Sequence, residues 1–220
     1  MSTTILIGLA GPLKSGKDTI ADHLVARHGF VKIGFADTIR EEVSKAFHLS
    51  EDMATILTEQ GIKDTPCPFL ALARCSNDEF LQYLIESNTE PLSFTAPRSP
   101  RWVQQQWGDF RRATMGWDYF IIAALKRIWA HWTAKTPPVG IVVSGVRFAH
   151  TAPFPEAEAD MIRENNGTMW HICRPGLETA SDHGTERGLA AQPDDHLITN
   201  DGTIADLLVK TDSLIASSPR

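Results

Sequence analysis

The sequence predicts an α/β protein, a three-layer sandwich in which helices cover both faces of a mostly parallel sheet of about five strands. Three observations lead to this fold class. Short apolar runs alternate with segments of helical apolar spacing near both ends of the chain. The short runs consist mainly of aliphatic residues, which is typical of strands buried on both faces. The chain has 220 residues, 42% of them hydrophobic and 22% charged, enough to bury a sizeable core.

The first part of the chain alternates strand and helix. The run TILIGLA (residues 4–10) is aliphatic and breaks at Gly11-Pro12, as a buried strand does. Residues 16–28 follow with apolar side chains at helical spacing. The run VKIGFA (residues 31–36) predicts a second strand, and Asp37 is a candidate cap for a helix that ends near residue 47. This order predicts right-handed crossovers between parallel strands.

The middle of the chain, residues 50–135, is expected to be a helical insertion. Ser50 and Ser76 each precede acidic and then apolar residues, a pattern typical of helix N-caps. Three prolines between residues 90 and 100 predict a loop. Two further helices are expected over residues 101–113 and 118–134. We therefore expect residues 1–220 to form one domain, with the insertion as a mobile substrate-binding segment.

The alternation resumes after Pro137-Pro138. Three more aliphatic runs predict strands over residues 139–144, 168–173 and 196–199. Helices are expected over residues 156–165 and 203–215, with a long polar loop over 174–194.

Composition excludes several classes of protein. The chain has 21 Lys+Arg and 27 Asp+Glu, and its net charge of −6 disfavours duplex DNA as a main partner. Three scattered cysteines cannot build a disulfide framework, and without a C-x-x-C pair a zinc site is disfavoured. No run approaches the roughly 18 apolar residues of a membrane span, and the first residues do not resemble a secretory leader. We expect a soluble protein of a reducing cytoplasm.

The strongest motif is Gly11-Pro-Leu-Lys14-Ser15-Gly16-Lys17, which matches G-x-x-x-x-G-K between a predicted strand and a predicted helix. Backbone N–H groups of such a loop curl around a phosphate, and the helix N-terminus adds positive charge. Lys17 would bridge the β- and γ-phosphates of a nucleoside triphosphate, ATP, as the main catalytic cation. The motif alone fits kinases, motors and switches.

The residue after Lys17 is Asp18, where the motif has Ser or Thr for the magnesium ion. Three arrangements stay open: Thr19 binds Mg²⁺ instead, Asp18 acts through a water, or the phosphates hold most of the metal.

Arginines are the candidates for binding a second phosphate group. Asp37 and Arg40 are three residues apart and share a helix face, so Arg40 can bind an acceptor phosphate. The alternative is a surface ion pair between them. Two further arginines, Arg147 and Arg174, follow predicted strands at the sheet edge where ligands bind. Arg147 would stabilise the transferring phosphoryl group, and Arg174 would flank the donor nucleotide.

The expected helix over 101–113 has two stripes. Its apolar stripe, which includes Trp107, would pack inward. The opposite stripe is either an anion-binding face or an ordinary solvated face, and consists of Arg101, Gln105, Gly108 and Arg112. Arg111 belongs to the same cluster of basic residues. Phe35 and Trp107, with Trp102 and Trp117, could stack on a base or lie in the core.

Seven segments together resemble the deoxynucleoside monophosphate kinases of bacteriophages and prophages. They occur in the family's order and span nearly the whole chain: GPLKSGKDT (11–19), FADTIR (35–40), PRSPRWVQQQWGDFRRA (97–113), VVSGVRF (142–148), ICRPG (172–176), HGTE (183–186) and DHLITNDGT (195–203). The resemblance implies a P-loop kinase fold and a GKDT loop in which Asp18 is usual. It also implies that Arg40 binds the acceptor phosphate and that Asp37 lies near the magnesium waters.

The resemblance implies transfer of the ATP γ-phosphoryl to a deoxynucleoside monophosphate, with Arg112 and Arg147 assisting Lys17. Two departures are visible: Gly145 replaces the family's strand-end acid, and the usual G-T-E reads Gly108-Asp109-Phe110. A kinase of modified pyrimidines in phage DNA and a non-enzymatic ATP-binding switch remain alternatives. A phage-encoded enzyme would act in the host cytoplasm, and an open sheet edge is a candidate homodimer surface.

Overall fold

The computed structural model describes residues 4–147, 153–177 and 189–217, and the chain divides into two compact units. The sheet unit contains the described residues up to Phe35 and those from Ile121 onward. The helical unit is Ala36–Phe120 and includes most of the segment expected as an insertion. Each unit has its own apolar core.

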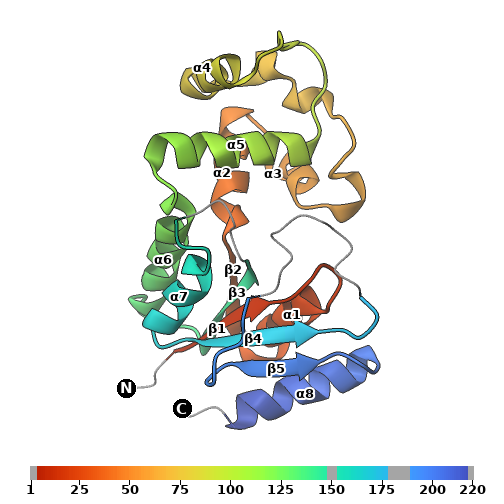
Figure 1. Cartoon of the computed structure of the whole chain (residues 1–220), viewed down its shortest axis with the longest axis vertical. Helices are drawn as coiled ribbons and strands as arrows, with labels where there is room; N and C mark the ends of the chain where they lie inside the picture. The colour runs from red at the N-terminus through yellow and green to blue at the C-terminus, as the bar shows by residue number, and fades with distance from the viewer. Residues whose placement is uncertain (1–3, 148–152, 178–188, 218–220) are drawn as a thin grey trace. The chain divides into compact units, whose positions relative to one another are not determined.

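The sheet unit is built on five parallel strands in the order β2-β3-β1-β4-β5 (Figure 1). The strands are β1 (Ile5–Ala10), β2 (Phe30–Gly34), β3 (Gly140–Val146), β4 (Thr168–Cys173) and β5 (His196–Thr199). Central β1 pairs with β3 on one side and β4 on the other, so Ile7 lies between Val142 and Thr168. The predicted number and direction of the strands are confirmed.

Helices cover both faces of this sheet, which makes three layers (Figure 1). They are α1 (Lys17–His28), α6 (Tyr119–Trp132), α7 (Ala157–Glu164) and α8 (Ile204–Ser217). Successive side chains of a strand point to opposite faces, so Leu6 packs with α6 and α7 while Ile7 packs with α1 and α8. Each aliphatic side chain that is fully buried in this way contributes about 1.5–3 kcal/mol.

The helical unit packs around an aromatic cluster. The rings of Phe80 and Trp107 have centroids 4.7 Å apart, and Phe80 and Phe110 are 5.5 Å apart, within the range of favourable ring pairs. All three rings are fully buried together with Val43 and Phe47. The helices are α2 (Ala36–Ala46), α3 (Glu51–Ala54), α4 (Asp78–Ser87) and α5 (Pro100–Met115), with 3-10 turns η1 (Thr55–Leu57), η2 (Gln60–Ile62), η3 (Pro68–Leu70) and η4 (Leu72–Arg74).

Three predicted helix caps have different outcomes. Ser50 caps α3 as predicted, its hydroxyl accepting a hydrogen bond from the Met53 N–H at 3.3 Å. The prediction for Ser76 is wrong, because Asn77 caps α4 and the Ser76 hydroxyl donates to the Ala46 carbonyl. The prediction for Asp37 is also wrong, since α2 already begins at Ala36. Asp37 lies in the first helical turn, where its negative charge interacts favourably with the helix dipole.

Among the described helices, none is long and apolar enough to cross a bilayer.

Candidate nucleotide site

The loop between β1 and α1 has the backbone geometry of a phosphate cradle. Gly11 has φ +145° and Gly16 has φ +110°, conformations that residues with a side chain rarely adopt. A Cβ at Gly11 would lie 2.3 Å from the Ile172 carbonyl oxygen, so glycine is also required there for space. Lys14 has φ +64°, and the Ser15 N–H donates to the Pro12 carbonyl at 3.2 Å. The chain therefore closes into a tight turn directly before α1.

The groups around this loop suit a phosphate oxygen. Because α1 begins at Lys17 and its N-cap residue is a glycine, the N–H groups of the first turn are available to an anion. The Lys17 ammonium folds across the loop and donates to the carbonyls of Gly11 and Pro12, both at 2.6 Å. The Ser15 hydroxyl is buried and has no hydrogen-bond partner among the described residues. A buried hydroxyl of this kind is a donor that a triphosphate can satisfy.

Asn200, which sequence reasoning missed, holds the loop by hydrogen bonds. Its side-chain amide donates to the Ser15 carbonyl at 2.8 Å, and its backbone N–H donates to the Cys173 carbonyl at 2.7 Å. A Cβ at Gly16 would lie 2.8 Å from the Asn200 amide nitrogen. Asn200 thus connects the ends of β4 and β5 to the phosphate loop.

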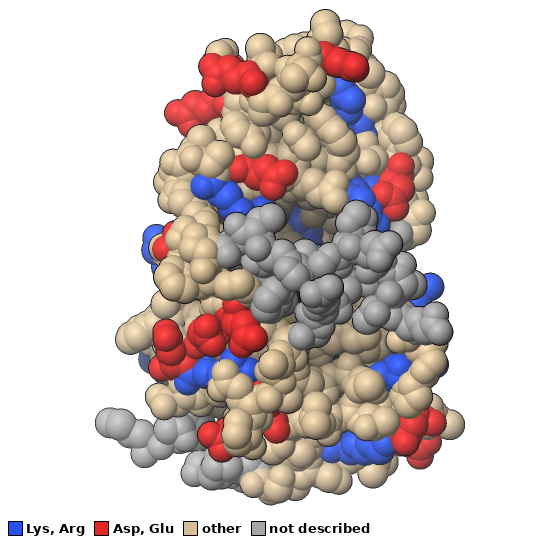
Figure 2. All heavy atoms as spheres, viewed as in Figure 1, with Lys and Arg blue, Asp and Glu red and all other residues tan. Residues whose placement is uncertain are grey.

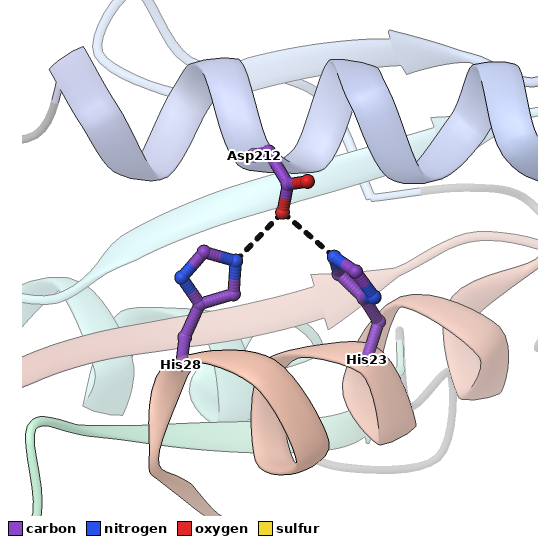
Figure 3. A group of neighbouring side chains, drawn as sticks. All are labelled: His23, His28 and Asp212. Carbon is purple, nitrogen blue, oxygen red and sulfur yellow. Dashed lines mark hydrogen bonds and ion pairs between the residues drawn. The ribbon is translucent and has the colours of Figure 1, made fainter.

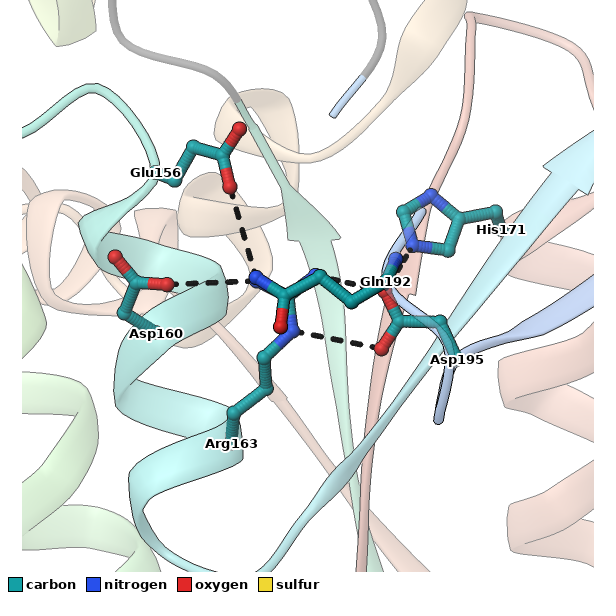
Figure 4. Close-up of polar contacts among 6 residues, drawn as sticks. All are labelled: Glu156, Asp160, Arg163, His171, Gln192 and Asp195. Atoms are coloured by element: carbon teal, nitrogen blue, oxygen red, sulfur yellow. Dashed lines mark hydrogen bonds and ion pairs between the residues drawn. The ribbon is translucent and has the colours of Figure 1, made fainter. Parts of the chain in front are cut away.

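Asp195, at the start of the DHLITNDGT segment that also contains Asn200, anchors the chain that leads into β5 (Figure 4). Its side chain is 3% exposed and pairs with Arg163 of α7 at 2.7 Å. His171 of β4 and the backbone N–H of Gln192 contact the same carboxylate at 2.9 and 2.8 Å. Burial alone would raise the pKa of Asp195, but these hydrogen bonds outweigh burial and hold its pKa below the ordinary value.

The last residue of the DHLITNDGT segment, Thr203, caps the N-terminus of α8. Thr203 Oγ1 accepts from the Asp206 N–H at 3.2 Å, and the Asp206 carboxylate accepts from the Thr203 N–H at 2.8 Å. This reciprocal arrangement is a capping box with aspartate in place of glutamate. The T-x-x-D spacing before an apolar run is a sequence signal that predicts it.

The oxygen donors expected to hold Mg²⁺ lie in both units. Asp18 and Thr19 are in the first turn of α1, directly after Lys17, while Asp37 belongs to the helical unit. The Asp18 side chain is 72% exposed and lies 3.5 Å from the Lys32 ammonium. Carboxylate and hydroxyl oxygens are the ligands that Mg²⁺ prefers, so Asp18 and Thr19 fit the ion chemically.

Arg147 and Arg174 follow β3 and β4 at the edge of the sheet where β1 leads into the phosphate loop. Both side chains are exposed. The Arg147 N–H donates to the Glu158 carboxylate at 2.8 Å, which fixes its backbone. The Arg174 guanidinium lies 3.5 Å from the Lys14 carbonyl, at the phosphate loop itself.

Gly145, where the resemblance leads one to expect an acid, has φ +76° near the end of β3. The pairing of β1 with β3 skips it, because Leu9 pairs with Ser144 and Ala10 pairs with Val146. Gly145 is therefore a bulge residue whose backbone conformation favours glycine. The segment His183–Glu186 lies outside the described residues.

In the helical unit, Asp37 and Arg40 form the i,i+3 ion pair that the sequence analysis left as an alternative to phosphate binding. Both side chains remain about 30% exposed, at 31% and 28%. The guanidinium has five N–H donors, so pairing with one carboxylate leaves capacity for a second anion.

Glu42 of α2, another residue missed by sequence reasoning, is the centre of a polar network. It accepts hydrogen bonds from Trp107 Nε1 at 2.7 Å, from Arg111 Nε at 2.9 Å and from the Tyr119 hydroxyl. Burial alone would raise the pKa of Glu42, but these three donors outweigh it and lower the pKa. The Arg111 guanidinium also lies 5.0 Å from the centre of the Phe110 ring. Arg111 and Trp107 are thus held by contacts within the helical unit.

The two stripes of α5 are only partly as expected. Val103, Trp107 and Phe110 are buried as predicted. On the opposite stripe Arg101 and Gln105 are exposed, whereas Gly108 is buried between Arg112 of the same helix and Ile39 of α2. A Cβ at Gly108 would lie 3.2 Å from Arg112 Nη1 and 3.6 Å from Ile39 Cδ1, so the tighter contact would be with the guanidinium.

The arginines of this stripe both have acidic partners. Arg101 contacts both carboxylate oxygens of Asp64, at 2.6 and 3.2 Å, and Arg112 lies 3.4 Å from Asp109. Each side chain is 51% exposed, so these ion pairs contribute little to stability and both guanidinium groups remain accessible.

Two of the aromatic candidates for base stacking lie in the cores. Phe35 is 9% exposed within the sheet unit, and Trp107 is 1% exposed within the helical unit. Trp102 is half-buried, and its ring packs against the Arg98 guanidinium at 4.5 Å.

Comparison with known proteins identifies the family. The model of a family described as deoxynucleotide monophosphate kinase matches residues 111–211. A protein of Acanthamoeba polyphaga mimivirus, whose name provisionally assigns it as a deoxynucleotide monophosphate kinase, is 30% identical over 203 residues, 91% of this chain and 90% of its own. The deoxynucleotide monophosphate kinase of Enterobacteria phage T4 is 40% identical over 53 residues, 24% of this chain and 22% of its own.

Among solved structures, TT1252 from Thermus thermophilus aligns over 99% of both chains, with a TM-score of 0.46 at 13% identity. The mimivirus relative covers nearly the whole chain, and its alignment confirms the resemblance that the seven segments indicate. The chain belongs to the deoxynucleotide monophosphate kinase family and is a phosphotransferase that acts on a nucleotide.

Proposed function

We propose that this protein transfers the γ-phosphoryl group of ATP to a deoxynucleoside 5′-monophosphate, giving ADP and a deoxynucleoside diphosphate. The observation that carries the proposal is the phosphate loop: two glycines with positive φ, the Lys17 ammonium across the turn and the orphaned Ser15 hydroxyl. In a member of this kinase family, such a loop binds the triphosphate donor.

The reaction needs positioning and charge neutralisation more than proton transfer. An oxygen of the acceptor phosphate forms a bond to the γ-phosphorus as the bond to the bridging oxygen of ADP breaks. That acceptor oxygen is already anionic, so no strong general base is required. Lys17 and the loop N–H groups would hold the donor phosphates, with Arg147 and Arg174 beside them.

Residues of the helical unit are proposed for the acceptor. Arg40 and Arg101 would bind the monophosphate, Gln105 would contact the nucleoside, and Arg112 would help neutralise the transferring group. When bound, Mg²⁺ supplies charge neutralisation on the phosphate oxygens, with Asp18, Thr19 and Asp37 as the residues that would hold it. We further propose that the helical unit moves when the acceptor binds.

The charge pattern supports a mononucleotide acceptor over a DNA strand. The chain carries a net charge of −6. Among the described side chains that are visible in Figure 2, basic residues are interspersed with acidic ones. A polynucleotide would favour an excess of basic side chains to neutralise its phosphates.

The test is to incubate the protein with ATP, Mg²⁺ and each of the four common deoxynucleoside monophosphates in turn, and to separate the products. We expect a diphosphate from at least one acceptor and its loss with Lys17→Ala. Lys135→Ala, which removes an exposed lysine outside the loop, is the matched control and should keep full activity. If ATP binds but no monophosphate is phosphorylated, the proposal is wrong. Assays with single-stranded DNA and modified nucleotides then separate the alternative kinase from the ATP-binding switch.

A further inference from the structure

Two histidines and one aspartate meet between the first and last helices of the sheet unit (Figure 3). His23 and His28 lie on α1, and Asp212 lies on α8. The Nε2 atoms of His23 and His28 are 2.7 and 2.6 Å from the same oxygen of Asp212, Oδ1. One ligand atom from each residue lies within 4.8 Å of the others. In the part of the chain that the structure describes, this is the group of three residues with metal-binding spacing.

The arrangement is close to what a tetrahedral metal ion requires. Ligands bound to zinc at about 2.0–2.1 Å lie about 3.3 Å apart at tetrahedral angles. The two nitrogen–oxygen distances therefore have to open by roughly 0.6–0.7 Å, and the two nitrogens have to lie near the same spacing. Small rotations of these three side chains achieve changes of this size.

The surroundings allow an ion to enter. The side chains of His23 and His28 are 12% and 24% exposed, whereas that of Asp212 is 50% exposed. The imidazoles are thus held by packing, while the carboxylate opens to solvent.

We propose that His23, His28 and Asp212 form a binding site for a divalent transition-metal ion of the zinc class. The bound ion would link α1 to α8. Two imidazoles and one carboxylate are ligands that Zn²⁺ shares with Co²⁺ and Ni²⁺. Three protein ligands leave the fourth position to water. Mg²⁺ prefers an all-oxygen, octahedral site. The proposed site is therefore chemically distinct from the site that would hold Mg²⁺ in the phosphotransfer reaction.

The site lies on the helix that carries the phosphate loop. α1 begins at Lys17, and His23 follows six residues later, about 9 Å along the helix axis. A metal bound there would stabilise the packing of α1 on α8 without occupying the nucleotide site. The proposal therefore does not rest on the proposed reaction.

The test uses tag-free protein treated with a chelator, titrated with Zn²⁺ by calorimetry in buffer that contains excess Mg²⁺. We expect one equivalent of Zn²⁺ to bind and to raise the melting temperature. Asp212→Asn and His23→Gln should each weaken binding by more than about tenfold, because even outer-sphere changes at metal sites cost 10–100-fold. Both replacements keep a side chain of similar size that can hydrogen-bond. His131→Gln on α6 is the matched control and should bind Zn²⁺ like the wild type.

Cobalt gives a second readout. Co²⁺ in a tetrahedral site absorbs strongly in the visible range, so the wild type should colour and the His23→Gln/His28→Gln double variant should not. Zn²⁺ binding of wild-type strength in both the Asp212 and His23 variants would place the metal elsewhere, for example at the free cysteines, and overturn the proposal. Absence of stoichiometric Zn²⁺ binding to the wild type would overturn it as well.

Discussion

Replacing Asn200 with alanine removes the amide that donates to the Ser15 carbonyl at 2.8 Å. The sequence of the phosphate loop itself is unchanged. Ser15 is fully buried, so its carbonyl loses a partner that water cannot readily replace. A buried acceptor left unsatisfied costs about 1–3 kcal/mol. We expect the free energy of unfolding to fall by about 1–2 kcal/mol, well within the 5–15 kcal/mol typical of a domain.

The same loss should weaken ATP binding. Without the Asn200 amide, the loop can leave its curled conformation, and binding has to restore it at a cost of up to about 1–2 kcal/mol. That cost corresponds to a rise of about 5–30-fold in the Kd for ATP. Calorimetric titration with ATP measures this change, and urea unfolding of the same protein measures stability.

A matched variant separates loop positioning from general destabilisation. Asn165 also donates its side-chain amide to a backbone carbonyl at 2.8 Å, that of Met161, but at the C-terminus of α7. Asn165→Ala should lose similar stability and keep the wild-type affinity for ATP. If Asn200→Ala lost stability but bound ATP as the wild type does, Asn200 would be a structural residue only and the reasoning would be refuted.

Three further predictions concern the acceptor, acid stability and the helical core. Arg40→Ala should raise the KM for the monophosphate or lower kcat while the Kd for ATP stays unchanged; unchanged kinetics would place the acceptor elsewhere. Asp195→Asn should cost about 1.5–3 kcal/mol at pH 7, because Arg163 loses its buried charged partner and keeps only the more exposed Asp160 and Glu156. The pKa of Asp195 is lowered by folding, so wild-type stabilisation is complete above about pH 4 and is lost as pH falls through the lowered value. Urea unfolding at pH 7 and pH 3 should show the deficit shrinking at the lower pH. Phe110→Ala should destabilise the protein by about 3–5 kcal/mol, whereas Phe69→Ala, at a ring that is 39% exposed, should cost less than about 1 kcal/mol by thermal unfolding.

Local patterns in the sequence predict the elements well because each depends on neighbours in the chain. The run Ile5–Ala10 is a strand because both its faces are buried, and residues 17–28 form a helix because their apolar positions recur on one face. The glycine-rich turn between them has a local signature, since backbone conformation decides which residues fit. Cap positions were less predictable, because Ser76 and Asn77 are neighbours and either can start a helix.

The missed residues depend on contacts between distant parts of the chain. Glu42 contacts Trp107, Arg111 and Tyr119, which are 65, 69 and 77 residues away. Asn200 contacts Ser15 across 185 residues. No spacing rule predicts such pairs, since they follow from how helices and strands pack. Arginines in one stripe of α5 could be found by spacing, but their partners could not.

Gly145 has a backbone role that the sequence alone does not show. In the sequence it looks like the loss of a strand-end acid. In the structure it is the extra residue of a bulge, with a φ that favours glycine, and its neighbours Ser144 and Val146 keep their pairing with β1. The glycine thus has a backbone reason of its own.

The segment from Asn200 to Asp212 supports the phosphate loop and its helix at three points. Asn200 holds the Ser15 carbonyl, Leu207 packs within 2.9 Å of where a Cβ at Gly16 would stand, and Asp212 contacts the far end of α1. Gly16 is therefore constrained twice, by its positive φ and by this packing, so even alanine would have to displace both Asn200 and Leu207. Because one short segment makes all three contacts, a change that loosens the start of α8 should also reach the loop. The phosphate cradle is thus a property of β4, β5 and α8 together, although only its G-x-x-x-x-G-K part is visible as a motif.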